Sequence, residues 1–276
     1  MALNAITQCI QIGAYAARYA GVRTHRIATS ISLFNLFVTA SRLAALFLTP
    51  SLGALADNAT RSSVVAKLST VPPEIVTRFD LQMRAIVAAG TLGTMLGGLL
   101  LPMFIYLFMR GIRAFERRNS VFRALVRLGD PRVMMDVMSS IRLPELNTVL
   151  AYTREAVPLK LLLGNLIVMA IYAIGVPSAY EASVLNLDAR TTAAGLSGIV
   201  NGIGTIAFTF FVDPTSALMV DQAVKGERSL DSIRAMVIGL TITAILGTIL
   251  SQLLLWPGAW AISHVASLFV HGFRRF

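Results

Sequence analysis

Five polar side chains near the N-terminus have the chemistry to bind a phosphate group. Arg18, Arg23 and Arg26 surround a glycine-containing turn, and Asn35 and Arg42 follow within the next apolar segment. Guanidinium groups bind phosphate oxygens through paired, charge-assisted hydrogen bonds. A charge inside a membrane costs at least about 2.5–3.5 kcal/mol, so it usually faces a cavity, a partner or an anion. We predict that these five side chains bind an anion. Alternatively, the arginines at the turn only set membrane topology, Asn35 packs between helices, and Arg42 forms a salt bridge.

Acidic side chains near the ends of apolar segments form a second candidate set. Asp57, Glu181, Asp213 and Asp221 could each carry a coupling proton or neutralise an arginine, or could be solvated loop residues. Asp213 is the most notable because it ends the apolar run of "FFVDPT".

The sequence offers little for metal or catalytic chemistry. One cysteine and three scattered histidines give no zinc or haem spacing. No aspartate-rich motif, Gly-Lys-Ser/Thr loop or Ser/His/Asp set is present. We therefore expect no metal site, no cofactor and no catalytic residue.

The elements that position these side chains are membrane helices. The chain is 55% hydrophobic and 14% charged, with a mean hydropathy of +0.70, which is too apolar for a soluble globule. About 20 apolar residues span a bilayer as a helix. Six stretches qualify, at about 3–22, 27–50, 85–109, 159–180, 191–212 and 235–255. A seventh, 259–273, is shorter and follows Pro257 and Gly258, so we expect a short C-terminal interfacial helix, with a re-entrant helix as the alternative.

The net charge of +10 is explained by membrane topology without a nucleic-acid partner. Sixteen Lys and Arg residues fall in the first, third and fifth connections, against seven on the other side. The positive-inside rule then places both termini outside and makes 110–158 a basic cytoplasmic loop. Its basic and aromatic pattern is typical of a segment that contacts anionic phospholipids. Its arginines could serve only to fix topology, or they could gather an anionic substrate.

Internal similarity divides the chain into two halves. Arg26 to Pro50 and Arg190 to Pro214 are both 24 residues apart, and each proline is followed seven residues later by an aspartate. "RAIV" at 84–87 likewise matches "RAMV" at 234–237. We predict a three-helix repeat at 1–109, a connector at 110–158 and a second repeat with the C-terminal helix at 159–276. Units of three spans must insert in opposite orientations, which is typical of alternating-access transporters. Duplication without transport is the alternative.

The stretch from Ala14 to Leu46 resembles the Amj family of bacterial lipid II flippases. The resemblance rests on "RYAGVRTHRIA", "SLFN" and the "SR" at 41–42, with "DP" at 213–214 as a plausible continuation. Close similarity is confined to about residues 13–45, whereas length and the six-span layout agree throughout. The resemblance implies a multi-pass protein of the bacterial cytoplasmic membrane that moves lipid II, an undecaprenyl pyrophosphate bearing a disaccharide-pentapeptide, to the outer leaflet.

This resemblance suggests roles for the cationic residues. Arg18, Arg23 and Arg26 would capture the pyrophosphate at the inner face, Arg42 would hold it deeper, and rocking of two inverted halves would reopen the site outward. The alternatives are a transporter of another lipid-linked anion, a membrane enzyme acting on a lipid pyrophosphate, and a scaffold for wall synthesis. The sequence also leaves a homodimer open.

Overall fold

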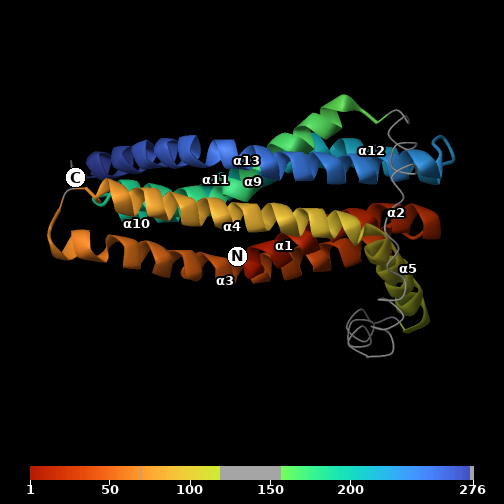
Figure 1. The fold of residues 1–276 in the computed structure, drawn as a ribbon. Helices are drawn as coiled ribbons and strands as arrows, with labels where there is room; N and C mark the ends of the chain where they lie inside the picture. The colour runs from red at the N-terminus through yellow and green to blue at the C-terminus, as the bar shows by residue number, and fades with distance from the viewer. Residues whose placement is uncertain (69, 119–156, 274–276) are drawn as a thin grey trace.

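The computed structural model describes residues 1–68, 70–118 and 157–273; the side chains of residues 40, 42, 44, 114–118 and 273 are not described. Every secondary-structure element of these residues is helical, and the helices form an elongated bundle (Figure 1). The all-helical class expected from the sequence is therefore confirmed.

The first half of the chain contains five helices. They are α1 (Ala2–Gly13), α2 (Tyr15–Thr24), α3 (Ile27–Val65), α4 (Pro73–Leu99) and α5 (Leu101–Arg118). Ala14 between α1 and α2 keeps helical dihedral angles, so these two helices form a nearly continuous rod. His25 ends α2 with a left-handed backbone at φ 54°, which turns the chain into α3.

The second half contains α9 (Leu159–Leu185), α10 (Arg190–Gly195), α11 (Ser197–Ala207), η1 (Phe208–Val212), α12 (Asp213–Val224) and α13 (Leu230–Phe273). The element η1 is a short π-helix directly before Asp213 and Pro214. Because proline has no backbone N–H, it cannot donate the helical hydrogen bond at this point, and a local π adjustment is one way to satisfy the backbone groups that it frees.

The helix connections divide between the two ends of the bundle (Figure 1). The turn after α2, the helix α5 and the turn between α12 and α13 lie at one end, which we call the basic end. The turns between α3 and α4 and between α9 and α10, together with the end of α13, lie at the other, which we call the distal end.

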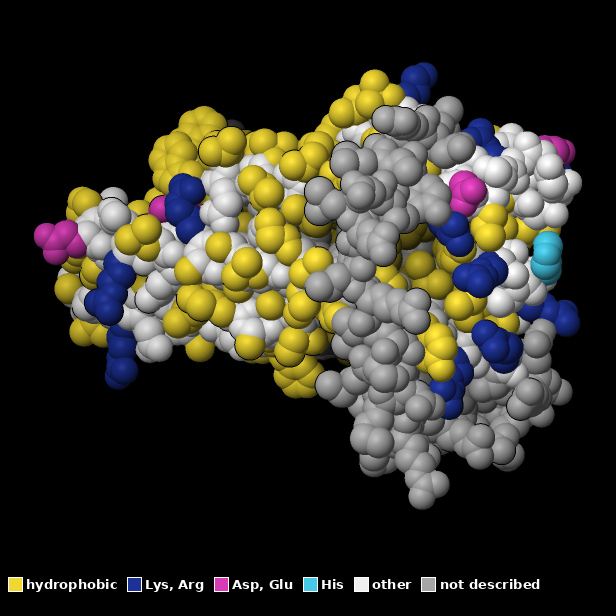
Figure 2. Space-filling model, turned by 45° about the vertical axis from the view of Figure 1, so that its right-hand side comes forward, with side chains coloured by type: hydrophobic (Ala, Val, Ile, Leu, Met, Phe, Trp, Pro, Cys, Tyr) yellow, Lys and Arg dark blue, Asp and Glu magenta, His cyan; other side chains and the backbone are white. Residues whose placement is uncertain are grey.

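Three helical segments are long and apolar enough to cross a membrane, namely α9, Arg190–Val224 and Leu230–Gly272. The pair α4 and α5 adds a fourth if it is one bent span. Large apolar side chains such as Phe47, Phe210, Leu253 and Leu268 are exposed on the bundle. Figure 2 shows hydrophobic side chains over the middle of the visible face, with Lys and Arg toward the ends. This distribution fits a multi-pass membrane protein.

Two sequence-based expectations about helices are wrong. The stretch 85–109 is not one straight helix, because the α4 and α5 segments meet at Leu100 at an angle of 62°. Pro102 explains the break, since its ring clashes with the carbonyl of Gly98 one turn earlier in a continuous helix. The stretch 259–273 is not a separate interfacial helix either. It continues α13 without interruption, and Pro257 lies inside that helix.

Buried polar contacts and glycines bring the helices together. Tyr15 donates a hydrogen bond of 2.8 Å to Asn165 Oδ1, and Asn165 Nδ2 donates to Leu240 O at 2.8 Å, which links α2, α9 and α13. Gly93 and Gly97 place α4 directly against the backbone of α1, with no room for a side chain.

Candidate functional site

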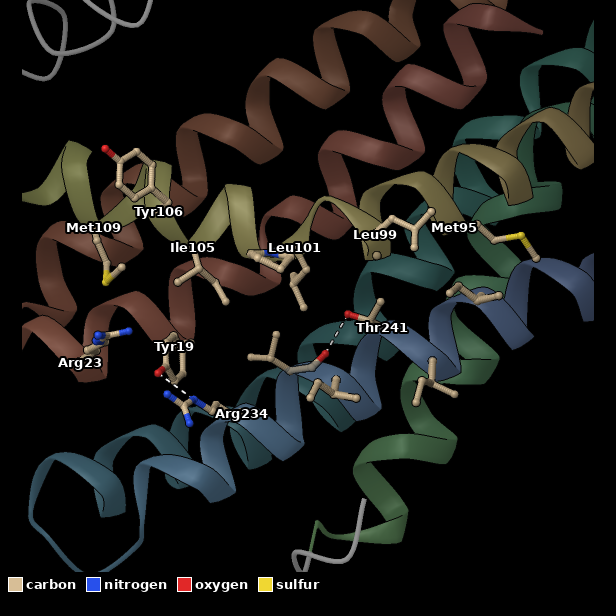
Figure 3. A pocket seen from close by; sticks show the side chains of 16 residues that line it. Tyr19, Arg23, Met95, Leu99, Leu101, Ile105, Tyr106, Met109, Arg234 and Thr241 are labelled. Carbon is tan, nitrogen blue, oxygen red and sulfur yellow. Dashed lines mark hydrogen bonds between the residues drawn. The ribbon is translucent and has the colours of Figure 1, made fainter. Parts of the chain in front are cut away.

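A groove of about 960 Å³ opens between α2, the α4–α5 bend and α13 (Figure 3). We call it the α2–α13 groove. Its walls come from both halves of the chain: α2, α4 and α5 from the first, and α13 from the second. Its size falls in the range of cavities that bind small molecules or part of a lipid chain.

The two cationic residues of the α2–α13 groove are Arg23 and Arg234. Arg234 Nε donates a hydrogen bond of 2.8 Å to Tyr19 Oη, and its Nη1 lies 3.0 Å from Asp231 Oδ1. The guanidinium also lies 5.3 Å from the centre of the Tyr19 ring. Arg23 is exposed, and no hydrogen-bond or ion-pair partner for it is found among the described side chains. The groove therefore contains one arginine held by neighbouring side chains, Arg234, and one that is not, Arg23.

The remaining wall of the groove is almost entirely apolar. Met95 and Leu99 come from α4, Ile105 from α5 and Ile242 from α13. The hydroxyl of Thr241 is already used, because it donates to Val237 O at 2.8 Å (Figure 3). A ligand that fits this groove has an anionic group beside a long apolar chain.

The α4–α5 bend creates this groove. By turning the chain 62° at Leu100, it directs α5 away from α13 and leaves the space between them. At the bend itself α4 and α13 touch, since a Cβ at Gly98 would lie 2.9 Å from Thr241 Cγ2. The sequence analysis counted 85–109 as one apolar span and did not identify this groove.

A second cavity, of about 440 Å³, lies between α2, α3 and α12; we call it the Arg18 pocket. Four of the predicted site residues line it: Arg18, Asn35, Asp213 and Asp221. Arg18 Nη2 forms a 2.7 Å ion pair with Asp213 Oδ1, and its guanidinium lies 5.9 Å from the centre of the Phe34 ring. The expected counter-charge role of Asp213 thus has a direct contact.

The Arg18 pocket is not a purely cationic cradle. The side chain of Arg18 is only 13% exposed, and its charge is opposed by Asp213 and by a second carboxylate, Asp221, in the pocket wall. Its Nη1 is buried and has no hydrogen-bond partner among the described residues. The two N–H groups of this nitrogen remain available to a ligand oxygen.

The structure separates the other predicted residues. Arg18 and Arg23 line different cavities, so the described side chains do not form one shared arginine cradle. Arg26 is exposed at the start of α3. Asp57 is exposed near the distal end of α3, and Glu181 is buried in α9. Arg42 lies in α3, but its side chain is outside the described residues, as is most of the predicted 110–158 connector.

Sequence reasoning missed Tyr19 and Arg234 as site residues. Arg234 was counted only as a topology signal in the fifth connection, although it begins the repeated "RAMV" motif. Its counterpart in the other half, Arg84 of "RAIV", is also engaged, through a 2.7 Å ion pair with Asp80. The available signal was the similarity between these two short stretches, each of which begins with an arginine.

The described residues include no group of three or more His, Cys, Asp or Glu side chains that could hold a metal ion. The polar groups of both cavities can bind and orient an anion through arginine. Neither cavity, among its described lining residues, pairs a nucleophile with a general base.

Comparison with known proteins places the chain in a family. The model of the family described as Amj, Alternate to MurJ, matches residues 3–266. A relative from Bacillus subtilis (strain 168), "Lipid II flippase Amj", is 33% identical over 261 residues, covering 94% of this chain and 93% of the relative. No solved structure matches. The match extends far beyond residues 13–45, and the chain therefore belongs to the Amj family.

Proposed function

We propose that this protein is a flippase that moves lipid II from the inner to the outer leaflet of the bacterial cytoplasmic membrane. Membership of the Amj family and the name of its B. subtilis relative support this function. The structural observation that carries the proposal is the α2–α13 groove, which combines two arginines with a long apolar wall. Such a protein is a transporter and not an enzyme.

The groove complements the two ends of a lipid pyrophosphate. The pyrophosphate binds Arg23 and Arg234, because charge-assisted hydrogen bonds from guanidinium groups are strong where water is scarce. Tyr19 and Asp231 hold Arg234 in place, so little ordering is needed when the ligand binds. Part of the undecaprenyl chain lies along the apolar wall, toward Ile242 and Ile245.

The Arg18 pocket provides a second polar site for the headgroup. Its free Arg18 Nη1 donates to the ligand, and Asn35 offers an amide for sugar or peptide groups. Arg26 attracts the anion at the basic end, and Arg42, deeper in α3, forms a later contact on the path. Arg18, Asp213 and Asp221 together give the pocket a formal charge of −1, which prevents the pyrophosphate from binding there too tightly to leave.

We infer that six membrane segments form two inverted repeats, 1–109 and 159–276, joined by the cytoplasmic connector at 110–158. In Figure 1 each segment of the first half runs opposite to its counterpart: α1–α2 to α9, α3 to α10–α12, and α4 to α13. The helix contacts are also similar. A Cβ at Gly97 would lie 2.8 Å from Cys9 O, and one at Gly247 would lie 2.5 Å from Leu166 O.

Charge supports the orientation of the molecule. Arg23, Lys225, Arg228 and Arg234 all lie near the connections at the basic end, which we assign to the cytoplasm by the positive-inside rule. This places the entry to the α2–α13 groove on the side where lipid II is made, next to anionic phospholipids bound by the basic connector. The residues of both cavities come from one protomer, so the proposed path does not require a homodimer.

The test is a sidedness assay on the full chain reconstituted in liposomes with lipid II. Extraction and mass measurement check that the lipid stays chemically unchanged, which an enzyme would not allow. Wild-type protein should expose inner-leaflet lipid II to an added labelling reagent. A second lipid-linked anion, undecaprenyl phosphate bearing another glycan, measures selectivity for the headgroup; equal transport of both would favour the broader alternative.

Variants of the cationic residues then locate the path. Arg23→Gln, Arg234→Gln and Arg42→Ala should each slow exposure of lipid II by roughly tenfold or more, as expected for loss of one charge-assisted contact worth about 1.5–3 kcal/mol. Arg61→Gln at the distal end of α3 is the matched control and should flip normally. Normal flipping by all three variants, at wild-type abundance, would refute the assigned path.

A further inference from the structure

A buried carboxyl group lies far from both cavities, at the distal end of the molecule. Glu181 of α9 is 1% exposed and follows Tyr180, whose hydroxyl packs beside Gly53 of α3. Glu181 interacts with Asp80 and Arg84, both on α4. Asp57 of α3 is exposed, and its charge interacts electrostatically with Tyr180. The proposed lipid path uses none of these groups.

The hydrogen bonds of this cluster are incomplete. Both carboxyl oxygens of Glu181 and one of Asp80 are buried without a donor among the described residues. The other oxygen of Asp80 accepts a 2.7 Å hydrogen bond from Arg84 Nε. Two carboxyl groups therefore face a single arginine. Because two carboxylates sharing one buried site repel each other, a single proton between Glu181 and Asp80 restores the balance.

We propose that Glu181 and Asp80 form a proton-binding site that couples lipid transport to the proton gradient across the membrane. The inference rests on the proposed flippase function and adds its energy source. A proton is the ligand that fits, because the two carboxyl groups supply too few described ligands for a metal cage.

The same arginine clamps two of the helices that form the α2–α13 groove, α4 and α13. Arg84 Nη1 donates to Gln252 O at 2.9 Å, and Gln252 Nε2 donates to Arg84 O at 3.0 Å. These reciprocal bonds join α4 to α13. Further along, α4 contributes Leu99 to the groove and α13 contributes Thr241. Arg84 and Leu99 are 15 residues apart, or about 22 Å along a helix, so a rigid helix connects the two sites.

Proton transfer then changes the clamp. With a proton on the pair, the one remaining carboxylate is Asp80, and Arg84 satisfies both Asp80 and the Gln252 carbonyl. When the proton leaves, two carboxylates compete for Arg84. The guanidinium is drawn toward Glu181, and its hydrogen bond to the Gln252 carbonyl weakens. The contact between α4 and α13 weakens, and the groove at their other end changes shape.

The experiment uses the full chain in liposomes that carry lipid II in both leaflets. A pH difference of one unit is imposed, and the steady-state ratio of lipid II between leaflets is measured. A step coupled to one proton should shift this ratio by up to about tenfold. Glu181→Gln and Asp80→Asn should abolish the shift, whereas Asp188→Asn, an exposed control just after α9, should keep it.

The outcomes separate this proposal from the proposed function. If wild-type protein equilibrates lipid II but ignores the pH difference, or if Glu181→Gln keeps the full shift, the proton site is overturned and the flippase stands. If wild-type protein moves no lipid II, the flippase proposal fails, and infrared spectroscopy of the purified protein tests the site directly. A protonated-carboxyl band that Glu181→Gln removes supports it, and the absence of such a band in wild type overturns it.

Discussion

The close contact between α1 and α4 can be tested by adding one methyl group. A Cβ at Gly93 would lie 2.5 Å from Ala5 Cα and would also overlap the Ala5 carbonyl oxygen. These are backbone atoms, so no side chain can move aside. Ordinary contact begins near 3.4 Å, and a Gly93→Ala variant must therefore push the two helices apart by about 1 Å in an interior that is otherwise close-packed.

The magnitude follows from two opposing effects. Overpacking of this kind costs about 1–3 kcal/mol, while alanine in place of glycine within a helix contributes about 0.5–1 kcal/mol of stability. These ranges allow a net loss in the free energy of unfolding of about 0–2.5 kcal/mol. Because the contacted atoms are backbone and cannot move aside, we expect about 1–2 kcal/mol. For a chain of this size that lowers the melting temperature by roughly 2–8 °C.

The assay is thermal unfolding of the purified protein in detergent, with a graded set of variants. Gly97→Ala should have a smaller effect than Gly93→Ala, because its Cβ would lie 2.8 Å from Cys9 O and beside the Ile12 side chain. Gly202→Ala, in α11 with no atom within 4 Å, should leave the melting temperature unchanged or raise it. If Gly93→Ala melts with or above Gly202→Ala, α1 and α4 do not meet as described.

Three further predictions concern the buried polar contacts and the groove. Asp213→Asn should destabilise the protein by about 1–2 kcal/mol in thermal unfolding. This is less than the loss of a fully buried ion pair would cost, because Asp213 is 48% exposed. Adding Arg18→Met should recover much of the loss, and additive effects in the double variant would contradict the pairing. Asn165→Leu should cost about 1–3 kcal/mol by the same assay, because it leaves the buried Tyr15 hydroxyl without its acceptor and removes one of the hydrogen bonds to the Leu240 carbonyl; Tyr15→Phe should cost less. Arg234→Gln should weaken lipid II binding, measured by titration in nanodiscs, by roughly tenfold or more, and the binding of wild-type protein should fall as salt is raised; salt-independent binding would argue against an ionic contact.

Local sequence determined the class of protein and part of the fold. Hydropathy depends only on composition along the chain, so it correctly indicated an all-helical, multi-pass membrane protein. The "RYAGVRTHRIA" stretch carried enough similarity to indicate the Amj family, which the whole-chain match then confirmed. Pro102 was visible in the sequence, but the α4–α5 bend was not predicted, because neighbouring helices often accommodate proline within a membrane span. Pro257, inside α13, shows the opposite outcome.

The candidate site depended on contacts between distant residues. Arg18 and Arg23 are close in sequence, yet the turn of the helix directs them to different cavities, and Arg18 meets Asp213 from 195 residues away. Four predicted residues do line the Arg18 pocket. They could be found from the sequence because polar side chains stand out inside or at the ends of apolar segments. The roles of Arg234 and Arg84 could not be predicted, because charge counting cannot distinguish a topology signal from a side chain held by tyrosine or by a partner helix.

The sequence by itself determined that this chain enters a membrane, because apolar side chains partition into lipid whatever their partners. Only the tertiary structure decided which charges face each other. Packing of α4 and α13 joins Arg84 to Gln252, packing of α4 and α9 brings Asp80 to Glu181, and the bend at Leu100 opens the α2–α13 groove. Each of these contacts depends on the position of a second helix, which the local sequence does not encode.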